Sequence, residues 1–115
     1  MTVRRVVPDL ATPALDASRR FYADVLDLAP VMDLGWVVAL ADPEGAGQVN
    51  LMTDEASAPV VPTMSVEVDD VDAAYAAAVE SGAEIVHPLT DEAWGVRRFF
   101  VRDPAGHVVN ILAHA

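Results

Sequence analysis

The first candidates for chemistry in this sequence are its three histidines, because imidazole is the usual acid, base and metal ligand near neutral pH. His87 stands near the end of a strand-forming run, His107 follows a turn, and His114 is the penultimate residue. No two of them have the spacing of a metal-ligand pair. We therefore interpret them as structural residues at a strand end, beside a turn and at a frayed end.

Nucleophilic and acid–base chemistry has few other candidates. The chain has no cysteine, and all seven basic residues are arginine, which excludes thiol chemistry and lysine Schiff bases. No serine or threonine has an identifiable histidine partner. Alternation along the predicted strands turns only two carboxylates inward, Asp9 and Glu67. The sequence therefore favours binding over catalysis.

The charge balance limits the possible partners. Seven basic residues against eighteen acidic ones give a net charge of -11, which repels nucleic acids and anionic membrane surfaces alike. The uninterrupted apolar runs, such as residues 36–41 and 73–79, are too short to cross a bilayer, and the N-terminal residues are not followed by a signal-peptide core. We expect a soluble, cytoplasmic protein that binds neither nucleic acid nor membrane.

Two segments predict amphipathic helices that position these residues. Thr12 and Pro13 suit the N-cap and the first helical position of the first helix. This helix is expected to end near Leu28, because Pro30 forces the residue before it into an extended conformation. The apolar stripe expected on this first helix is Ala14, Ala17, Phe21, Val25 and Leu28.

The second helix has signals at both ends. The acidic run at residues 69–72 provides a cap and complements the helix dipole, and Gly82 after Ser81 suits a left-handed C-terminal cap. The buried stripe expected on this second helix is Val71, Ala74, Tyr75, Ala78 and Val79.

Six runs between and after the helices predict strands. They are residues 34–41, 48–52, 63–68, 83–88, 96–102 and 108–113. Two connections share the turn sequence Asp-Pro-x-Gly, at residues 42–45 and 103–106, and each predicts an antiparallel hairpin.

The twin turns belong to an internal repeat. Residues of the first half recur at offsets of 60, 61 and 60: Gly35, Asp42 and Asn50 as Gly95, Asp103 and Asn110. Each half runs strand, helix and three strands. We predict one domain over residues 1–115, with a first module over about 1–57, a Pro-rich hinge over about 58–62 and a second module over about 63–115.

Residues 18–26, Ser-Arg-Arg-Phe-Tyr-Ala-Asp-Val-Leu, resemble the helix signature of the vicinal oxygen chelate superfamily, also called the glyoxalase, bleomycin-resistance and extradiol dioxygenase superfamily. In the second half, residues 66–75, Gly82-Ala83, Trp94-Gly95 and residues 102–107 follow the family pattern in order, so the resemblance covers essentially the whole chain. It implies an α+β fold in which two βαβββ modules form a cupped, barrel-like mixed sheet that holds a divalent metal or an organic ligand.

The resemblance also allows the metal positions to be checked. Metal-using members place four ligands, usually His and Glu, near the start and end of each module. In this sequence those positions fall on Val7, Asn50, Thr63 and Asn110. They supply neither imidazole nor carboxylate, the donors that hold a catalytic divalent ion. The resemblance therefore implies a member without metal or other cofactor, and no catalytic residue is assigned.

Strand alternation predicts which residues line the cup. The second hairpin, closed by a type I turn with a bulged glycine, pairs Phe100 with Asn110 and Arg98 with Leu112. The ligand-binding residues expected from this register mix polar and apolar types, as small-molecule sites do. They are Val7, Gln48, Asn50, Met52, Thr63, Trp94, Arg98, Phe100, Asn110 and Leu112.

Each polar member of this set has a purely structural alternative. The two asparagines could bond each other or trapped water. Arg98 needs a carboxylate, from a ligand or from a neighbour such as Glu67, and an internal ion pair would satisfy it. Trp94 could close over a ligand or cover the end of the core.

These features predict a metal-free protein that binds a small organic molecule, as in drug or toxin sequestration of the bleomycin-resistance type. The acidic surface would suit a cationic ligand. A homodimer is expected by family analogy. The alternatives are a glyoxalase-like lyase or isomerase or a dioxygenase with non-standard metal ligands, and an interaction module whose cup is filled by its own side chains.

Overall fold

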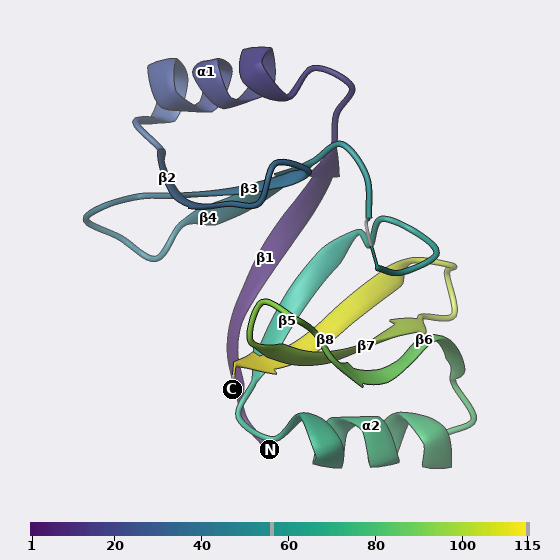
Figure 1. The fold of residues 1–115 in the computed structure, drawn as a ribbon. Coiled ribbons are helices and arrows are strands. Elements are labelled where there is room, and N and C mark those ends of the chain that lie inside the picture. Colours follow the sequence, from purple (N-terminus) through teal and green to yellow (C-terminus); the bar gives the residue numbers. More distant parts are fainter. Residues whose placement is uncertain (56, 115) are drawn as a thin grey trace. The chain divides into compact units, whose positions relative to one another are not determined.

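The computed structural model describes residues 1–55 and 57–114 and has the order strand, helix and three strands twice (Figure 1). The α+β class and the two successive βαβββ runs are confirmed. The elements are β1 Val3–Ala11, α1 Leu15–Leu26, β2 Ala29–Asp33, β3 Val37–Ala41, β4 Gln48–Met52, β5 Met64–Val68, α2 Val71–Glu80, β6 Glu84–Asp91, β7 Val96–Arg102 and β8 Val108–His114.

The chain divides into two compact units. The first unit is Val7–Val61, and the second unit is Met1–Val6 together with Pro62–Ala115. The first strand therefore contributes to both: its start lies in the second unit, where β1 neighbours β5, and its end pairs with β4 in the first unit. The predicted module boundaries remain a prediction, which this division into units does not test.

In the second unit the strand order is β1-β5-β8-β7-β6. The pair β5 and β8 is parallel, and the pairs β7–β8 and β6–β7 are antiparallel. The helix α2 covers one face of this sheet, where Val68, Val71, Ala74 and Phe99 form the buried cluster. The Tyr75 ring meets the Phe99 ring edge-on, with centroids 5.0 Å apart.

The second helix begins and ends where the sequence predicts. The Asp70 side chain accepts a hydrogen bond from the Ala73 backbone nitrogen at 3.0 Å, and Gly82 has a φ of 78°. Four of the five residues predicted for its buried stripe lie in or against the core cluster. The exception is Val79, which is exposed at the edge of the stripe.

In the first unit the strand order is β2-β3-β4-β1, with β1 and β4 parallel. The helix α1 packs on a buried cluster formed by Val38, Leu40 and Leu51. Its contacts with this cluster come from Leu15 and Tyr22.

Both the start and the buried face of α1 differ from the prediction. The Thr12 hydroxyl accepts from the Ala14 backbone nitrogen at 3.0 Å and bonds the Ser18 hydroxyl at 2.8 Å, so a turn precedes the helix. The helix thus begins at Leu15. The predicted stripe is wrong for Phe21 and Val25, which are exposed, whereas its last member, Leu28, packs against the cluster.

The segment after α1 also differs from the prediction, since it forms β2 where no strand was expected. Asp27, with a φ of 57°, ends the helix, and the chain then pairs with β3. Pro30 is tolerated because β2 is the edge strand of its sheet, where a missing N–H donor costs little. The strand predicted over residues 34–41 is shorter and begins at Val37.

The twin turns form the predicted hairpins. Asp42 accepts from the Glu44 backbone nitrogen at 2.9 Å, and Asp103 accepts from that of Ala105 at 3.0 Å. Each aspartate therefore closes its own turn, as Asp at the first turn position does generally. The register predicted for the second hairpin, which pairs Phe100 with Asn110, is confirmed.

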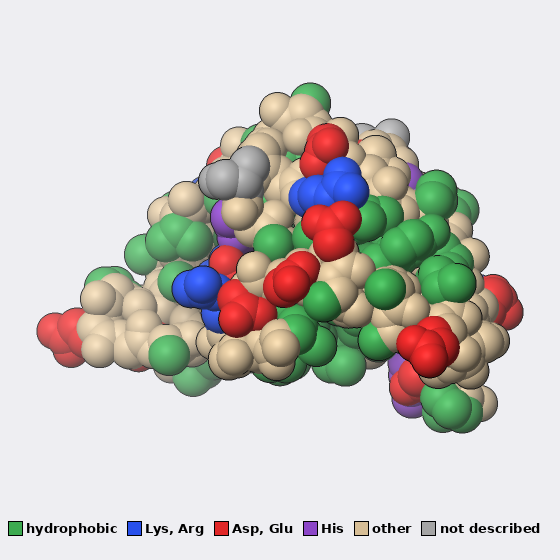
Figure 2. All heavy atoms as spheres, turned by 90° about the horizontal axis from the view of Figure 1, so that it is seen from below, with side chains coloured by type: hydrophobic (Ala, Val, Ile, Leu, Met, Phe, Trp, Pro, Cys, Tyr) green, Lys and Arg blue, Asp and Glu red, His purple; other side chains and the backbone are tan. Residues whose placement is uncertain are grey.

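The surface reflects the acidic composition. Figure 2, a view from below Figure 1, shows acidic side chains spread over this face and basic groups lying against acidic ones. Arg97 of β7 pairs with Asp72 of α2 at 2.9 Å and with Asp91 of β6 at 3.1 Å. Within residues 1–55 and 57–114, no helix is long and apolar enough to span a membrane.

Candidate functional site

The candidate site lies on the face of the second unit's sheet that α2 leaves uncovered. Alternate residues of β5, β7 and β8 pack against α2, among them Val66, Phe99 and Ile111. Their neighbours in sequence must therefore point to the opposite side. We call this opposite side the helix-free face; it carries Ser65, Glu67, His87, Arg98, Phe100, Asn110 and Leu112.

The helix-free face carries a buried ion pair. Both nitrogens Nε and Nη2 of Arg98 lie within hydrogen-bond distance of Glu92 Oε2, at 2.8 and 2.7 Å. The side chains of Arg98 and Glu92 are 4% and 5% exposed. Arg98 thus has the internal carboxylate partner that a buried guanidinium requires.

The partner suggested for Arg98 from the sequence, Glu67, is wrong. Glu67 accepts from Arg5 Nε and from His114 Nδ1, each at 2.7 Å. Burial raises the pKa of Glu67, but the His114 hydrogen bond and the charges of Arg5 and His114 outweigh it and hold this pKa below its usual value. Glu67 therefore ties β1, β5 and β8 together.

Two aromatic rings surround the Arg98 guanidinium. Its central carbon lies 5.0 Å from the centroid of the Trp94 ring and 4.8 Å from that of Phe100. Cations at such distances are attracted to the ring faces. Trp94 comes from the connection between β6 and β7, so this loop brings both the ring and Glu92 to Arg98. Sequence reasoning missed Glu92, because nothing local distinguishes it from the neighbouring acidic residues.

Asn110 is buried on the helix-free face with half of its amide unused. Its Nδ2 donates to the Ser65 hydroxyl at 3.0 Å, and the two residues pair in register. Its Oδ1 is buried and has no hydrogen-bond partner among the described residues. The residue that faces Asn110 is therefore Ser65, whereas the predicted Thr63 lies exposed just before β5.

His87 also belongs to this face, although the sequence placed it at a strand end. The strand continues to Asp91, and His87 pairs with Phe100, their ring centroids 5.3 Å apart. Its Nε2 lies 4.0 Å from Glu92 Oε2 and is buried without a hydrogen-bond partner among the described residues. Pro88 suggested the end of a strand, and two bulges in β6 obscure the alternation that would have revealed His87.

The first unit has a corresponding polar group on the side away from α1. Asp9 pairs in register with Asn50, whose Nδ2 donates to Asp9 Oδ1 at 2.8 Å. Gln48 Nε2 donates to Asn50 Oδ1 at 3.3 Å. Asp9 is buried, as are the predicted apolar residues Val7 and Met52. Asp9 with Asn50 thus repeats the register position of Ser65 with Asn110.

Neither the pair of Ser65 and Asn110 nor the pair of Asp9 and Asn50 suits the divalent metal that the resemblance implies for other members of the superfamily. Ser65 and Asn110 are neutral, and the Asn110 amide nitrogen already donates to the hydroxyl. In the first unit the amide nitrogen of Asn50 engages the Asp9 carboxylate. Catalytic divalent ions are held by imidazole and carboxylate ligands, which these pairs lack apart from Asp9. No group of three or more His, Asp or Glu among the described residues could hold a metal ion.

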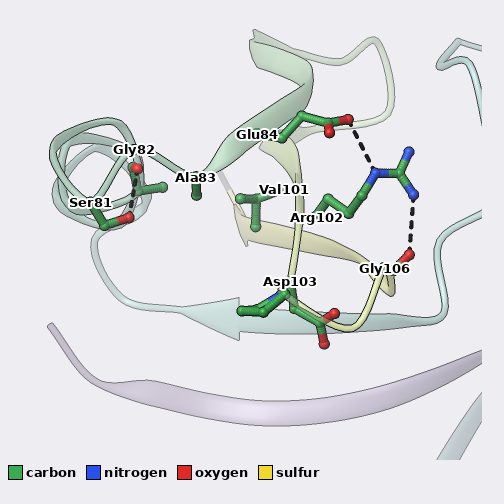
Figure 3. Close-up of a pocket in the computed structure, with 10 residues that line it drawn as sticks. Ser81, Gly82, Ala83, Glu84, Val101, Arg102, Asp103 and Gly106 are labelled. Atoms are coloured by element: carbon green, nitrogen blue, oxygen red, sulfur yellow. Dashed lines mark hydrogen bonds and ion pairs between the residues drawn. The ribbon is translucent and has the colours of Figure 1, made fainter.

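A separate hollow of about 780 Å³ lies in the second unit, between the end of α2 and the turn from β7 to β8 (Figure 3). None of the predicted site residues lines it. Arg102, its one cationic group, bonds Glu84 and the Gly106 carbonyl, both at 3.1 Å. The Ser81 hydroxyl donates to the Ala78 carbonyl at 2.8 Å. Because these polar groups bond one another, the helix-free face is the stronger candidate.

Comparisons with known proteins agree with the fold. The sequence pattern of the Glyoxalase/Bleomycin resistance protein/Dioxygenase superfamily matches residues 3–111. The uncharacterized protein Mb0911c of Mycobacterium bovis is 44% identical over 45 residues, 39% of this chain and 30% of that protein. The matched segment thus spans less than a third of that relative.

Two solved structures show the same fold at low identity. A superfamily member from Vibrio splendidus 12B01 has a TM-score of 0.73 at 22% identity, covering 97% of this chain and 99% of that one. Methylmalonyl-CoA epimerase from Mycobacterium tuberculosis has a TM-score of 0.68 at 20% identity, covering 98% of this chain and 87% of that one. Such likeness concerns the fold, and the site must be argued from its own residues.

Proposed function

The chain belongs to the Glyoxalase/Bleomycin resistance protein/Dioxygenase superfamily, and we propose that it is a member that binds a small organic molecule without a divalent metal. The proposed location is the cytoplasm, and the proposed role is sequestration of a drug or toxin. Residues proposed to contact the ligand in the second unit are Thr63, Trp94, Arg98, Phe100, Asn110 and Leu112. In the first unit, taken by itself, the residues proposed to contact a ligand are Val7, Gln48, Asn50 and Met52.

The observation that supports this proposal most directly is the unused carbonyl oxygen of Asn110. A buried acceptor left without a partner costs about 1–3 kcal/mol, which a bound molecule with a donor group would recover. The same residue stands at a position where the superfamily's metal-using members carry an acidic ligand. A neutral amide there favours hydrogen bonding to a guest over coordination of an ion.

Calorimetric titration of the purified protein with Mn²⁺, Ni²⁺ and Zn²⁺ is expected to give no tight, stoichiometric heat. The physical reason is the neutral donor set of Ser65 and Asn110. The Asn110→Ala variant serves as control, since any heat from weak surface sites should be the same in both proteins. Tight one-to-one binding that disappears in Asn110→Ala would contradict the proposal.

One observation favours the alternative of an enzyme with non-standard ligands. His87 is the only histidine that the described structure places on the helix-free face with an unbonded, buried nitrogen. Turnover of a thiol–aldehyde adduct or a catechol in the presence of Mn²⁺ or Fe²⁺ tests this alternative. Turnover that is lost in His87→Phe would establish the enzyme and displace the binding role.

We also propose that the chain forms a homodimer through the first unit. Large apolar side chains of α1 and β2 are exposed there: Phe21, Val25, Leu26, Val31 and Met32. Large apolar side chains exposed on successive elements favour an interface there. Their burial against a second copy would remove them from water.

The double variant Phe21→Glu/Val25→Glu is therefore expected to be a monomer, because two charges would have to be buried at the interface. Sedimentation velocity at micromolar concentration measures the change. The control is Val79→Glu, an equally exposed apolar position on α2 of the second unit, which should remain dimeric. A wild-type protein that sediments as a monomer would refute the proposed dimer.

A further inference from the structure

We infer that His87 contacts the ligand at the end of the site opposite Asn110, and that the ligand is a neutral, flat molecule with hydrogen-bonding groups at two opposite ends. This inference rests on the proposed function and names the class of molecule that the site would take. It is carried by the placement of two buried, unbonded polar atoms on one face of one sheet.

The two atoms belong to a single row of residues across the second unit's sheet. In register, His87 of β6 pairs with Phe100 of β7, Phe100 pairs with Asn110 of β8, and Asn110 pairs with Ser65 of β5. Paired Cα atoms of antiparallel strands are about 4.5–5.5 Å apart, so those of His87 and Asn110 are about 10 Å apart. Phe100 lies between them.

Each end of the row offers one hydrogen bond that the described protein does not use. His87 Nε2 and Asn110 Oδ1 are both buried without a partner, although buried polar groups are nearly always bonded. The amide oxygen accepts, and the imidazole nitrogen donates or accepts according to its tautomer. A molecule with a donor near Asn110 and a second polar group near His87 would satisfy both.

The two oppositely charged side chains described beside this row, Arg98 and Glu92, pair with each other, which argues for a neutral ligand. Arg98 and Glu92 form a short ion pair, and Asn110 and Ser65 are uncharged. A cationic ligand, which the net charge of the whole chain suggested, would meet the Arg98 guanidinium beside Phe100. The negative net charge of the chain therefore does not predict the charge of the ligand at this site.

The aromatic residues of the row argue for a flat ligand. The buried Phe100 ring contacts the His87 ring edge-on, and the Trp94 ring lies near Arg98 in the same group. Aromatic rings gain from edge-to-face and offset contacts with other rings, beyond the area they bury. A six-membered ring with polar substituents in para positions matches a row whose two polar ends are separated by one aromatic residue.

NMR titration with small probes tests this inference. The probes are 4-hydroxybenzamide, which has both polar ends, its cationic counterpart 4-hydroxybenzamidine, and toluene, which has neither. We expect 4-hydroxybenzamide to shift the imidazole signals of His87 and the side-chain amide signals of Asn110 together. Toluene and 4-hydroxybenzamidine are expected to bind at least tenfold more weakly.

A variant series separates the two ends of the site. His87→Phe keeps a ring against Phe100 and removes the nitrogen, so its affinity for 4-hydroxybenzamide is expected to fall about tenfold, the equivalent of one hydrogen bond. His107→Phe, at an exposed turn position, is the matched control and should bind as the wild type does. If His87→Phe does not fold, the wild-type shifts alone decide whether both side chains contact the probe.

The possible failures are distinguishable. Shifts at Asn110 with unchanged affinity in His87→Phe would overturn the role of His87 and leave the proposed function standing. Equal or tighter binding of 4-hydroxybenzamidine would overturn the neutral class. The absence of shifts at both residues with all three probes would mean that the two atoms serve only a trapped water, and the proposed function would fall with the inference.

Discussion

Replacing Arg98 with methionine is expected to lower the free energy of unfolding by about 3–5 kcal/mol. Methionine preserves much of the side chain's length beside Trp94 and Phe100, but it removes the guanidinium from the buried Glu92 carboxylate. Removing one partner of a buried ion pair is costly for this reason, whatever the pair contributes as a whole. Urea unfolding at pH 7 measures the loss.

Two further variants identify the cause of this loss. The double variant Arg98→Met/Glu92→Gln should recover most of it, because the uncompensated charge is gone. Arg97, the residue before Arg98 in β7, forms exposed pairs with Asp72 and Asp91, and Arg97→Met should cost less than about 1 kcal/mol for each pair that it breaks. If Arg98→Met and Arg97→Met lower the free energy of unfolding equally, burial does not make the loss of the Arg98 pair more costly than the loss of an exposed pair.

Truncation of Phe99 or of Phe100 to alanine is expected to lower the free energy of unfolding by a similar amount, about 3–5 kcal/mol each. Both side chains are fully buried. They point to opposite faces of β7: Phe99 packs with Tyr75 of α2, whereas Phe100 meets His87. Similar losses of stability are therefore expected from different environments, and thermal or urea unfolding measures both.

The two positions should differ in binding. With the milder variants Phe99→Leu and Phe100→Leu, which leave more of the fold's stability, only Phe100→Leu should weaken the binding of 4-hydroxybenzamide. The reason is that Phe100 lies between the two unbonded polar atoms, while Phe99 lies under α2. Equal weakening by both leucine variants would show that binding responds to general destabilisation.

The parts of the fold that sequence predicted correctly depend on local chemistry. Asp70 and Gly82 set the two ends of α2, and Asp103 closes the last hairpin. Because the turn fixes the register of β7 and β8, it also placed Arg98 and Phe100 on the same face as Asn110. The Asp-Pro-Ala-Gly turn therefore predicted which residues of β7 and β8 share a face.

The parts that sequence missed depend on longer-range choices. Because of the turn in which Thr12 bonds Ser18, α1 begins later in the chain than predicted. Its buried face contains Tyr22, and Phe21 is exposed. In the site, the missed residues His87 and Glu92 lie in a bulged strand and just beyond its end. Alternation cannot be followed through bulges, and no local pattern shows which of several acidic residues will meet Arg98.

The first strand has a consequence for any attempt to separate the halves of this chain. Its opening residues are held to the second unit, where Asp69 and Thr2 exchange hydrogen bonds and Arg5 reaches Glu67, while its end pairs with Asn50 in the first unit. A cut between residues 61 and 62 would therefore give one fragment that still carries an edge of the other's sheet. Each piece would be an incomplete folding unit on its own, and the natural way to restore the missing pairing is reassociation of the two.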